Sequence, residues 1–136
     1  MKTIIVYYSY TGNTKCIAEQ YAKAKKAELY EIKDQKRPGT FSAYAAGCFR
    51  AMRQKATPIQ AVDVDFSSYD KIIVMAPVWA GHPAPPFNSL IALLPKGTAV
   101  ELNMISASGE SGGKDRVIAF VESKGCAVTD YVDIKR

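Results

Sequence analysis

The sequence contains little that would place the protein in a membrane or outside the cell. Its 136 residues include three cysteines, Cys16, Cys48 and Cys126, which are widely spaced and lack the CxxC pairing of a zinc or dithiol site. No apolar run approaches the length of a membrane span, and the apolar stretch 4–8 is too short for a secretory signal. We therefore expect a cytoplasmic protein without a metal site, in which the cysteines are small packed apolar residues.

Acidic residues are also in the minority, and the formal net charge is +5 at pH 7. The basic residues gather over 23–37 and 50–55, but Glu28, Glu31 and Asp34 interrupt the first group. No aromatic residues alternate with them, as stacking on single-stranded nucleic acid would require. We expect a solvated basic face and no nucleic-acid partner. The sequence has one histidine, His82, with no acidic residue nearby in sequence, so we expect an exposed loop side chain and assign no catalytic residue.

Hydrophobic runs predict the strands of a parallel sheet in one domain, 1–136. The runs 3–8 and 71–76 are apolar without alternation, which is typical of central strands covered on both faces. The segments 99–106 and 127–134 read as further strands, and 28–33 alternates like an edge strand. Helical spacing over 14–27, 41–55, 87–94 and 114–123 places a helix between successive strands. This alternation predicts an α/β fold with five parallel strands, four helical segments and right-handed crossovers.

Three polar or glycine-rich loops, 9–14, 77–86 and 106–113, each follow an apolar strand. Ligands of open α/β sheets bind at the carboxyl ends of the strands, so these loops should meet around a ligand. In the first loop, the N–H groups of a helix N-terminus and the hydroxyls of Ser9, Thr11 and Thr14 suit a small anion, and Gly12 permits close approach. The alternative is a plain helix cap, in which Thr11 or Asn13 satisfies backbone donors.

Other phosphate-binding motifs are absent from this turn. It matches neither GxxxxGK[ST] nor GxGxxG. A receiver domain would need acidic residues at the end of the first strand, where Tyr7, Tyr8 and Ser9 stand. A cysteine phosphatase would need a cysteine and an arginine that frame a phosphate loop, and neither residue type occurs within 9–14.

The turn Ser9-Tyr10-Thr11-Gly12-Asn13-Thr14 resembles the phosphate loop of the flavodoxin family, whose pattern is Ser/Thr-x-Thr-Gly-x-Thr. The run 77–81, PVWAG, is similar to the aromatic-bearing flavin loop of that family. The resemblance implies a doubly wound five-stranded sheet in the order 2-1-3-4-5 and a non-covalently bound flavin mononucleotide (FMN), with Trp79 stacked on its ring. The implied cofactor-binding residues are Ser9, Tyr10, Thr11, Gly12, Asn13, Thr14, Pro77, Val78, Trp79, Ala80, Gly81, Ser106, Ala107, Ser108, Gly109, Gly112 and Gly113.

The function that the resemblance implies is electron transfer through bound FMN, with donor and acceptor unidentified. Two alternatives stay open: an NAD(P)H-dependent flavin or quinone reductase, and a binding module that has kept the fold without redox activity. The third loop has no aromatic residue to cover the second face of the flavin, which leaves that side more open. Unlike the generally acidic flavodoxins, this chain is basic, so we expect a less negative reduction potential and a different partner.

The sequence also lacks the usual C-terminal helix of the family after its fifth strand. A parallel sheet is normally buried on both faces. We therefore expect exposed apolar residues around Val128, Tyr131 or Val132, covered by another subunit or by a rearranged segment, and we favour a homodimer.

Overall fold

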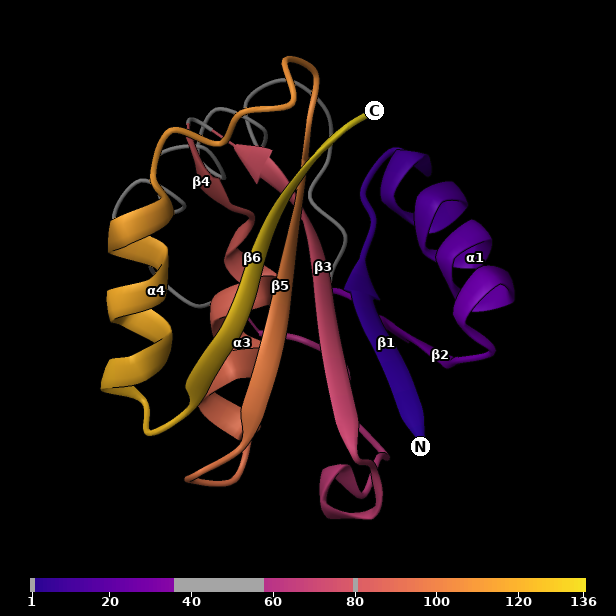
Figure 1. Cartoon of the computed structure of the whole chain (residues 1–136), viewed down its shortest axis with the longest axis vertical. Coiled ribbons are helices and arrows are strands. Elements are labelled where there is room, and N and C mark those ends of the chain that lie inside the picture. The colour runs from indigo at the N-terminus through magenta and orange to yellow at the C-terminus, as the bar shows by residue number, and fades with distance from the viewer. Residues whose placement is uncertain (1, 36–57, 80) are drawn as a thin grey trace.

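A single parallel sheet with helices on both faces forms the protein, and the computed structural model describes residues 2–35, 58–79 and 81–136 (Figure 1). The elements are β1 (Thr3–Tyr8), α1 (Asn13–Lys25), β2 (Glu28–Ile32), the 3-10 helix η1 (Phe66–Ser68), β3 (Lys71–Trp79), β4 (His82–Pro83), α3 (Pro85–Leu93), β5 (Ala99–Ser106), α4 (Lys114–Ser123) and β6 (Ala127–Lys135). The helix predicted over 41–55 lies outside the described residues. The other predicted helices and strands are present, with ends that differ by at most a few residues.

The long strands lie in the order β2-β1-β3-β5-β6, and every neighbouring pair among them is parallel. Counted without the short β4, this is the predicted order 2-1-3-4-5, which is therefore confirmed. β4 was not predicted. It pairs antiparallel with the end of β3, where Trp79 lies opposite His82, because the chain reverses at Gly81 with a φ of 82° that glycine adopts readily.

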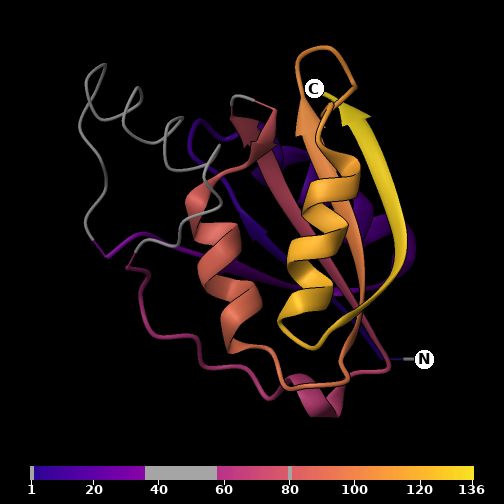
Figure 2. The ribbon, with the colours of Figure 1, turned by 90° about the vertical axis from the view of Figure 1, so that its left-hand side faces the viewer.

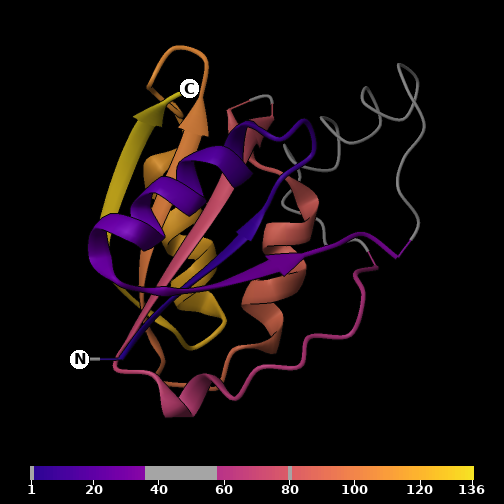
Figure 3. The same cartoon turned by 90° about the vertical axis from the view of Figure 1, so that its right-hand side faces the viewer.

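Helices cover the two faces of the sheet unequally. Helices α3 and α4 lie side by side on one face (Figure 2), and α1 lies on the other (Figure 3). Alternate residues of the central strands serve the two faces, so Ile4 and Val6 belong to the core beneath α3 and α4 while Ile5 belongs to the core beneath α1. This double burial explains why β1 and β3 carry unbroken apolar runs.

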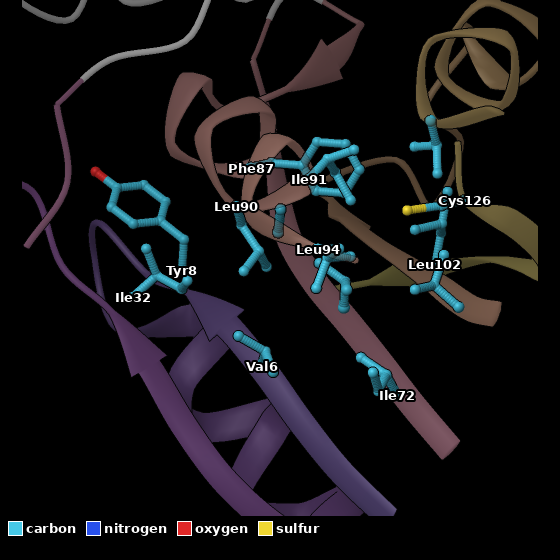
Figure 4. Close-up of a cluster of buried hydrophobic side chains, with 14 of the residues drawn as sticks. Val6, Tyr8, Ile32, Ile72, Phe87, Leu90, Ile91, Leu94, Leu102 and Cys126 are labelled. Carbon is cyan, nitrogen blue, oxygen red and sulfur yellow. The ribbon is translucent and has the colours of Figure 1, made fainter. Parts of the chain in front are cut away.

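The larger core lies between the sheet and α3 (Figure 4). Phe87, Leu90 and Ile91 of α3 are at most 2% exposed and contact strand residues such as Val6 and Leu102. Removing one of these side chains to alanine would cost about 2–5 kcal/mol of stability. This packing fixes the position of the sheet's carboxyl edge, from which the three predicted loops emerge.

The expectation of exposed apolar residues around Val128, Tyr131 or Val132 is confirmed for Val132 alone. A register shift follows Val100, which pairs with Val128, whereas the next residue of β5 pairs with Asp130. This bulge places Val128 and Tyr131 against the core on the α4 side, and only Val132 is exposed, by 38%.

The two described cysteines differ in exposure. Cys126 is buried, as predicted, whereas Cys16 is exposed on α1, so the prediction of a packed apolar role fails there. Cys48 lies outside the described residues.

Among the helices that the structure describes, none combines the length and the apolar character that a membrane crossing requires.

Candidate functional site

The three predicted loops meet around a cavity of about 140 Å³ at the carboxyl ends of β1, β3 and β5. The lining residues are Tyr10, Thr11, Asn13, Thr14, Pro77, Val78, Trp79, Ile105, Ser106, Ala107 and Arg136. All of them except Ile105 and Arg136 were predicted from the sequence. A more open hollow of about 610 Å³ lies along α1 and β2. The cavity at the strand ends is the better candidate, because hydroxyl, amide, indole and guanidinium groups converge there from distant parts of the chain.

The first loop presents polar groups without internal partners at the start of α1. The helix begins at Asn13. Its N-cap residue is Gly12, whose φ of 98° is left-handed and which has no side chain to cap the helix. Within the described residues, the backbone N–H groups of Thr11, Asn13 and Thr14 donate no hydrogen bond. These N–H groups lie at the positive end of the helix dipole, where an anion is stabilised.

Ser9 plays a different part from the one that the sequence suggested. Its Oγ accepts hydrogen bonds from the backbone N–H groups of Gly12, at 3.1 Å, and Lys15, at 3.2 Å. Ser9 does not line the cavity. The hydroxyl therefore fixes the shape of the loop, and part of the capping expected of Thr11 or Asn13 is done by Ser9.

The second loop contributes the only tryptophan of the sequence. Trp79 is 7% exposed, and its ring meets the rings of Tyr8 and Tyr10 edge-on, with centroids 6.2 Å and 5.6 Å away. These contacts hold the indole at one wall of the cavity. Ala80 lies outside the described residues, and Gly81 does not line the cavity.

The third loop reaches the cavity only with Ser106 and Ala107. The remaining predicted residues, Ser108, Gly109, Gly112 and Gly113, lie away from the cavity wall. The far part of the loop is attached to β6: Ser111 donates its N–H to Asp133 Oδ1 at 3.1 Å and bonds through its hydroxyl to the Tyr131 hydroxyl. Burial raises the pKa of Tyr131, the hydrogen bond from Ser111 lowers it in part, and the charge of Asp133 raises it further.

His82 is buried, which contradicts the expectation of an exposed loop side chain. It is 8% exposed, and its Nδ1 atom has no hydrogen-bond partner among the described residues. Burial lowers the pKa of His82, and the nearby charge of Arg116 lowers it further. Both effects favour the neutral imidazole, which lies beside Gly113, at the N-terminus of α4. In the described ranges, no three His, Cys, Asp or Glu side chains are grouped to hold a metal ion.

Arg136 is the main lining residue that sequence reasoning missed. Its N–H donates to the carbonyl oxygen of Ser106 at 3.0 Å, which continues the pairing of β6 with β5. The parallel order of strands contained a usable signal, because the carboxyl end of the last strand must lie at the same edge as the loops. Ile105 was missed because it belongs to a strand and not to a loop.

Comparison with known proteins identifies the fold. No protein-family model matches this sequence, and no curated protein matches it either. A flavoprotein from Lactobacillus acidophilus NCFM, solved in complex with FMN, is 28% identical, with a TM-score of 0.77, and the match covers 96% of this chain and 91% of that one. The two-electron reduced flavodoxin from Megasphaera elsdenii matches at a TM-score of 0.58 and 19% identity, over 96% of this chain and 83% of that one. This chain has a flavodoxin-like fold.

The apo-form of the same Lactobacillus acidophilus flavoprotein is also similar to this flavodoxin-like chain. It is 27% identical, with a TM-score of 0.69, and the match covers 97% of this chain and 92% of that one. The similarity therefore extends over nearly the whole chain.

Proposed function

We propose that this chain binds FMN non-covalently in the cavity at the strand ends and transfers electrons through it. The observation that carries the proposal is the meeting of all three predicted loops at one cavity, next to N–H groups at the start of α1 that have no partner among the described residues. The similar flavoprotein from Lactobacillus acidophilus was solved with FMN. When bound, FMN would supply one-electron and two-electron redox chemistry.

The residues present fit the parts of FMN. The N–H groups of Thr11, Asn13 and Thr14 suit the phosphate, because they are unpaired donors at the positive end of a helix. The wall formed by Trp79 suits the flat apolar ring system. Ser106 and Ala107 line the same cavity. Among the other predicted residues, Gly81 and Gly113 would act by letting the second and third loops approach each other.

An absorbance spectrum of the purified protein and a fluorescence titration with FMN test the proposal. We expect yellow protein, or quenched flavin emission with one FMN bound per chain. Thr11→Val keeps the shape of the side chain but removes its hydroxyl, and it should weaken FMN binding, whereas Thr98→Val, at the distant turn before β5, should not. Colourless wild-type protein that does not bind micromolar FMN would remove the redox assignment and leave a non-redox module.

The electron donor separates a carrier from a reductase. We propose a carrier that a partner protein reduces. NADH or NADPH added to the FMN-loaded chain in the absence of oxygen should leave the visible absorbance band of the flavin unchanged, because hydride transfer from a nicotinamide needs a site that positions it against the flavin. Rapid bleaching of this band would select the NAD(P)H-dependent flavin or quinone reductase instead.

We also propose a cytoplasmic location and a homodimer. The location is supported by the absence of a disulfide between the described cysteines, Cys16 and Cys126. The homodimer is supported by the exposed Val132, on the face of β6 that is turned away from α4. A monomeric mass at micromolar concentration would exclude the homodimer, and the Val132→Lys variant should shift a dimer toward monomers.

A further inference from the structure

Arg136 lines the cavity in which the proposed ligand would be bound. It lines the same cavity as Thr11, Asn13 and Thr14, although more than a hundred residues separate them in sequence. The hydrogen bond from its N–H to the Ser106 carbonyl, at 3.0 Å, fixes its backbone. Figure 1 shows the end of β6 curving toward the end of the molecule where α1 begins. The position of Arg136 is thus set by the sheet and not by a free loop.

The charges of the cavity are unbalanced. Among the described lining residues, Arg136 is the one with a charged side chain, and none of them is an aspartate or a glutamate. Within the described part of the chain, Arg136 forms no ion pair with an acidic side chain. The other polar groups there are hydroxyls, an amide, an indole and backbone N–H groups. The described lining side chains therefore offer hydrogen-bond donors and one guanidinium, which suits an anionic ligand better than a cationic one.

We propose that Arg136 makes the site selective for the phosphorylated flavin, so that the chain discriminates FMN from riboflavin. This inference rests on the proposed function. A guanidinium forms charge-assisted hydrogen bonds with phosphate oxygens, and these are stronger than the hydrogen bonds of neutral hydroxyl or amide donors. Riboflavin has no phosphate and gains nothing from Arg136. The residue is thus a determinant of specificity, and it has no part in moving electrons.

Lys135 provides a matched control. It is the neighbouring residue and carries the same charge, but it does not line the cavity and its Cβ lies beside Gly109. Arg136→Gln and Lys135→Gln therefore remove one positive charge from adjacent positions. Only the first removes a charge from the cavity. Any effect of the overall charge of the protein on anion binding appears equally in both variants.

The experiment measures dissociation constants for FMN and for riboflavin with wild-type, Arg136→Gln and Lys135→Gln protein, by quenching of flavin fluorescence. We expect Arg136→Gln to bind FMN about 10- to 100-fold more weakly, the range for a hydrogen bond to a charged group, with riboflavin affinity unchanged. Lys135→Gln should change neither by more than about twofold. Equal FMN affinity in Arg136→Gln and wild type, or an equal loss for both flavins, would overturn the role of Arg136.

Two further results keep this inference separate from the proposed function. If wild-type protein binds neither flavin, the proposed function fails and the role of Arg136 fails with it. If wild type binds both flavins equally, the FMN site stands and only the selectivity is wrong. Should Arg136→Gln not fold, the wild type still decides: FMN affinity must fall with added NaCl more steeply than riboflavin affinity, and equal salt dependence would overturn the inference.

Discussion

Gly113 and Gly81 lie so close together that a Cβ atom on Gly113 would come within 2.7 Å of the Gly81 carbonyl oxygen. The same Cβ would lie 3.0 Å from Nδ1 of His82. Gly113 precedes α4 at the end of the third loop, and Gly81 belongs to the reversal after β3. The contact between these glycines therefore sets the distance between two of the three loops that meet at the candidate site.

Gly113→Ala should destabilise the protein and weaken FMN binding. The φ of Gly113 is −118°, which alanine adopts freely, so the cost comes from the contact alone. We expect a loss of about 1–3 kcal/mol in the free energy of unfolding, as for other overpacked sites, measured by urea denaturation. Gly97→Ala is the control: it is strained by a φ of 86° but lies before β5, away from the site, so it should reduce stability without changing FMN affinity. Unchanged FMN affinity in Gly113→Ala would show that the spacing of the loops does not matter.

Ser9→Ala should loosen the first loop. The backbone N–H groups of Gly12 and Lys15 would both lose their acceptor, and removal of a comparable helix cap costs about 0.5–2 kcal/mol. We expect this loss in urea denaturation, together with weaker FMN binding. Ser123→Ala, which removes only an exposed hydrogen bond to the Phe120 carbonyl, should stay within about 0.5 kcal/mol of wild type. Equal stability of the two variants would contradict the role of Ser9.

The main elements and the meeting of the loops could be predicted because they depend on local patterns. Unbroken apolar runs identify β1 and β3, since only strands covered on both faces carry them. The parallel order then forces the loops after these strands to one edge of the sheet, and Trp79 and Thr11 do line one cavity.

The features that were missed depend on contacts between distant segments. The burial of His82 results from the pairing of β4 with β3, and the two-residue strand β4 is too short to leave a pattern. The bulge at Val100 changes which residues of β6 share a face. Val128 and Tyr131 therefore pack against the same core, although they are three residues apart in sequence. Arg136 reaches the cavity through the strand order, which is fixed only when the whole sheet forms.

Lys71→Met should destabilise the protein, because it leaves the buried carboxylate of Glu101 without its cationic partner. Glu101 is 8% exposed. It accepts a hydrogen bond from Asn103 Nδ2 at 3.0 Å and forms an ion pair with Lys71 Nζ at 3.1 Å. We expect a loss of about 1–3 kcal/mol at pH 7, less than for a fully buried pair because the Lys71 side chain is 36% exposed. The double variant Lys71→Met with Glu101→Gln should regain part of this loss in urea denaturation. No recovery would show that the ion pair is not the cause.

The same carboxylate should make stability depend on pH in the acid range. Burial raises the pKa of Glu101, but the hydrogen bonds from Asn103 and Lys71 and the charge of Lys71 outweigh it, so the net shift is downward from 4.5. A lowered pKa in the folded state gives stability that is present above pH 4.5 and is lost as pH falls through the folded pKa. Glu101→Gln should show a smaller loss of stability below that pH than wild type.

His82 should give a second pH dependence, in the range from about pH 7 to pH 5. Burial and the charge of Arg116 lower its pKa below 6.5 in the folded state. As pH falls through 6.5, the unfolded chain gains a proton on His82 that the folded chain does not, so the free energy of unfolding decreases. Above that pH both states are neutral at this residue, and no dependence is expected from it.

Because His82 is the only histidine of the sequence, its contribution can be isolated. Urea denaturation at about pH 7.5 and about pH 5 should show a fall in stability for wild type that is smaller in His82→Asn and His82→Gln. Arg116→Gln should also reduce the fall, because removing that charge raises the pKa of the buried imidazole. If wild type and both His82 variants lose stability equally over this range, the imidazole is not held neutral in the folded protein, and the pH dependence belongs to the carboxylates.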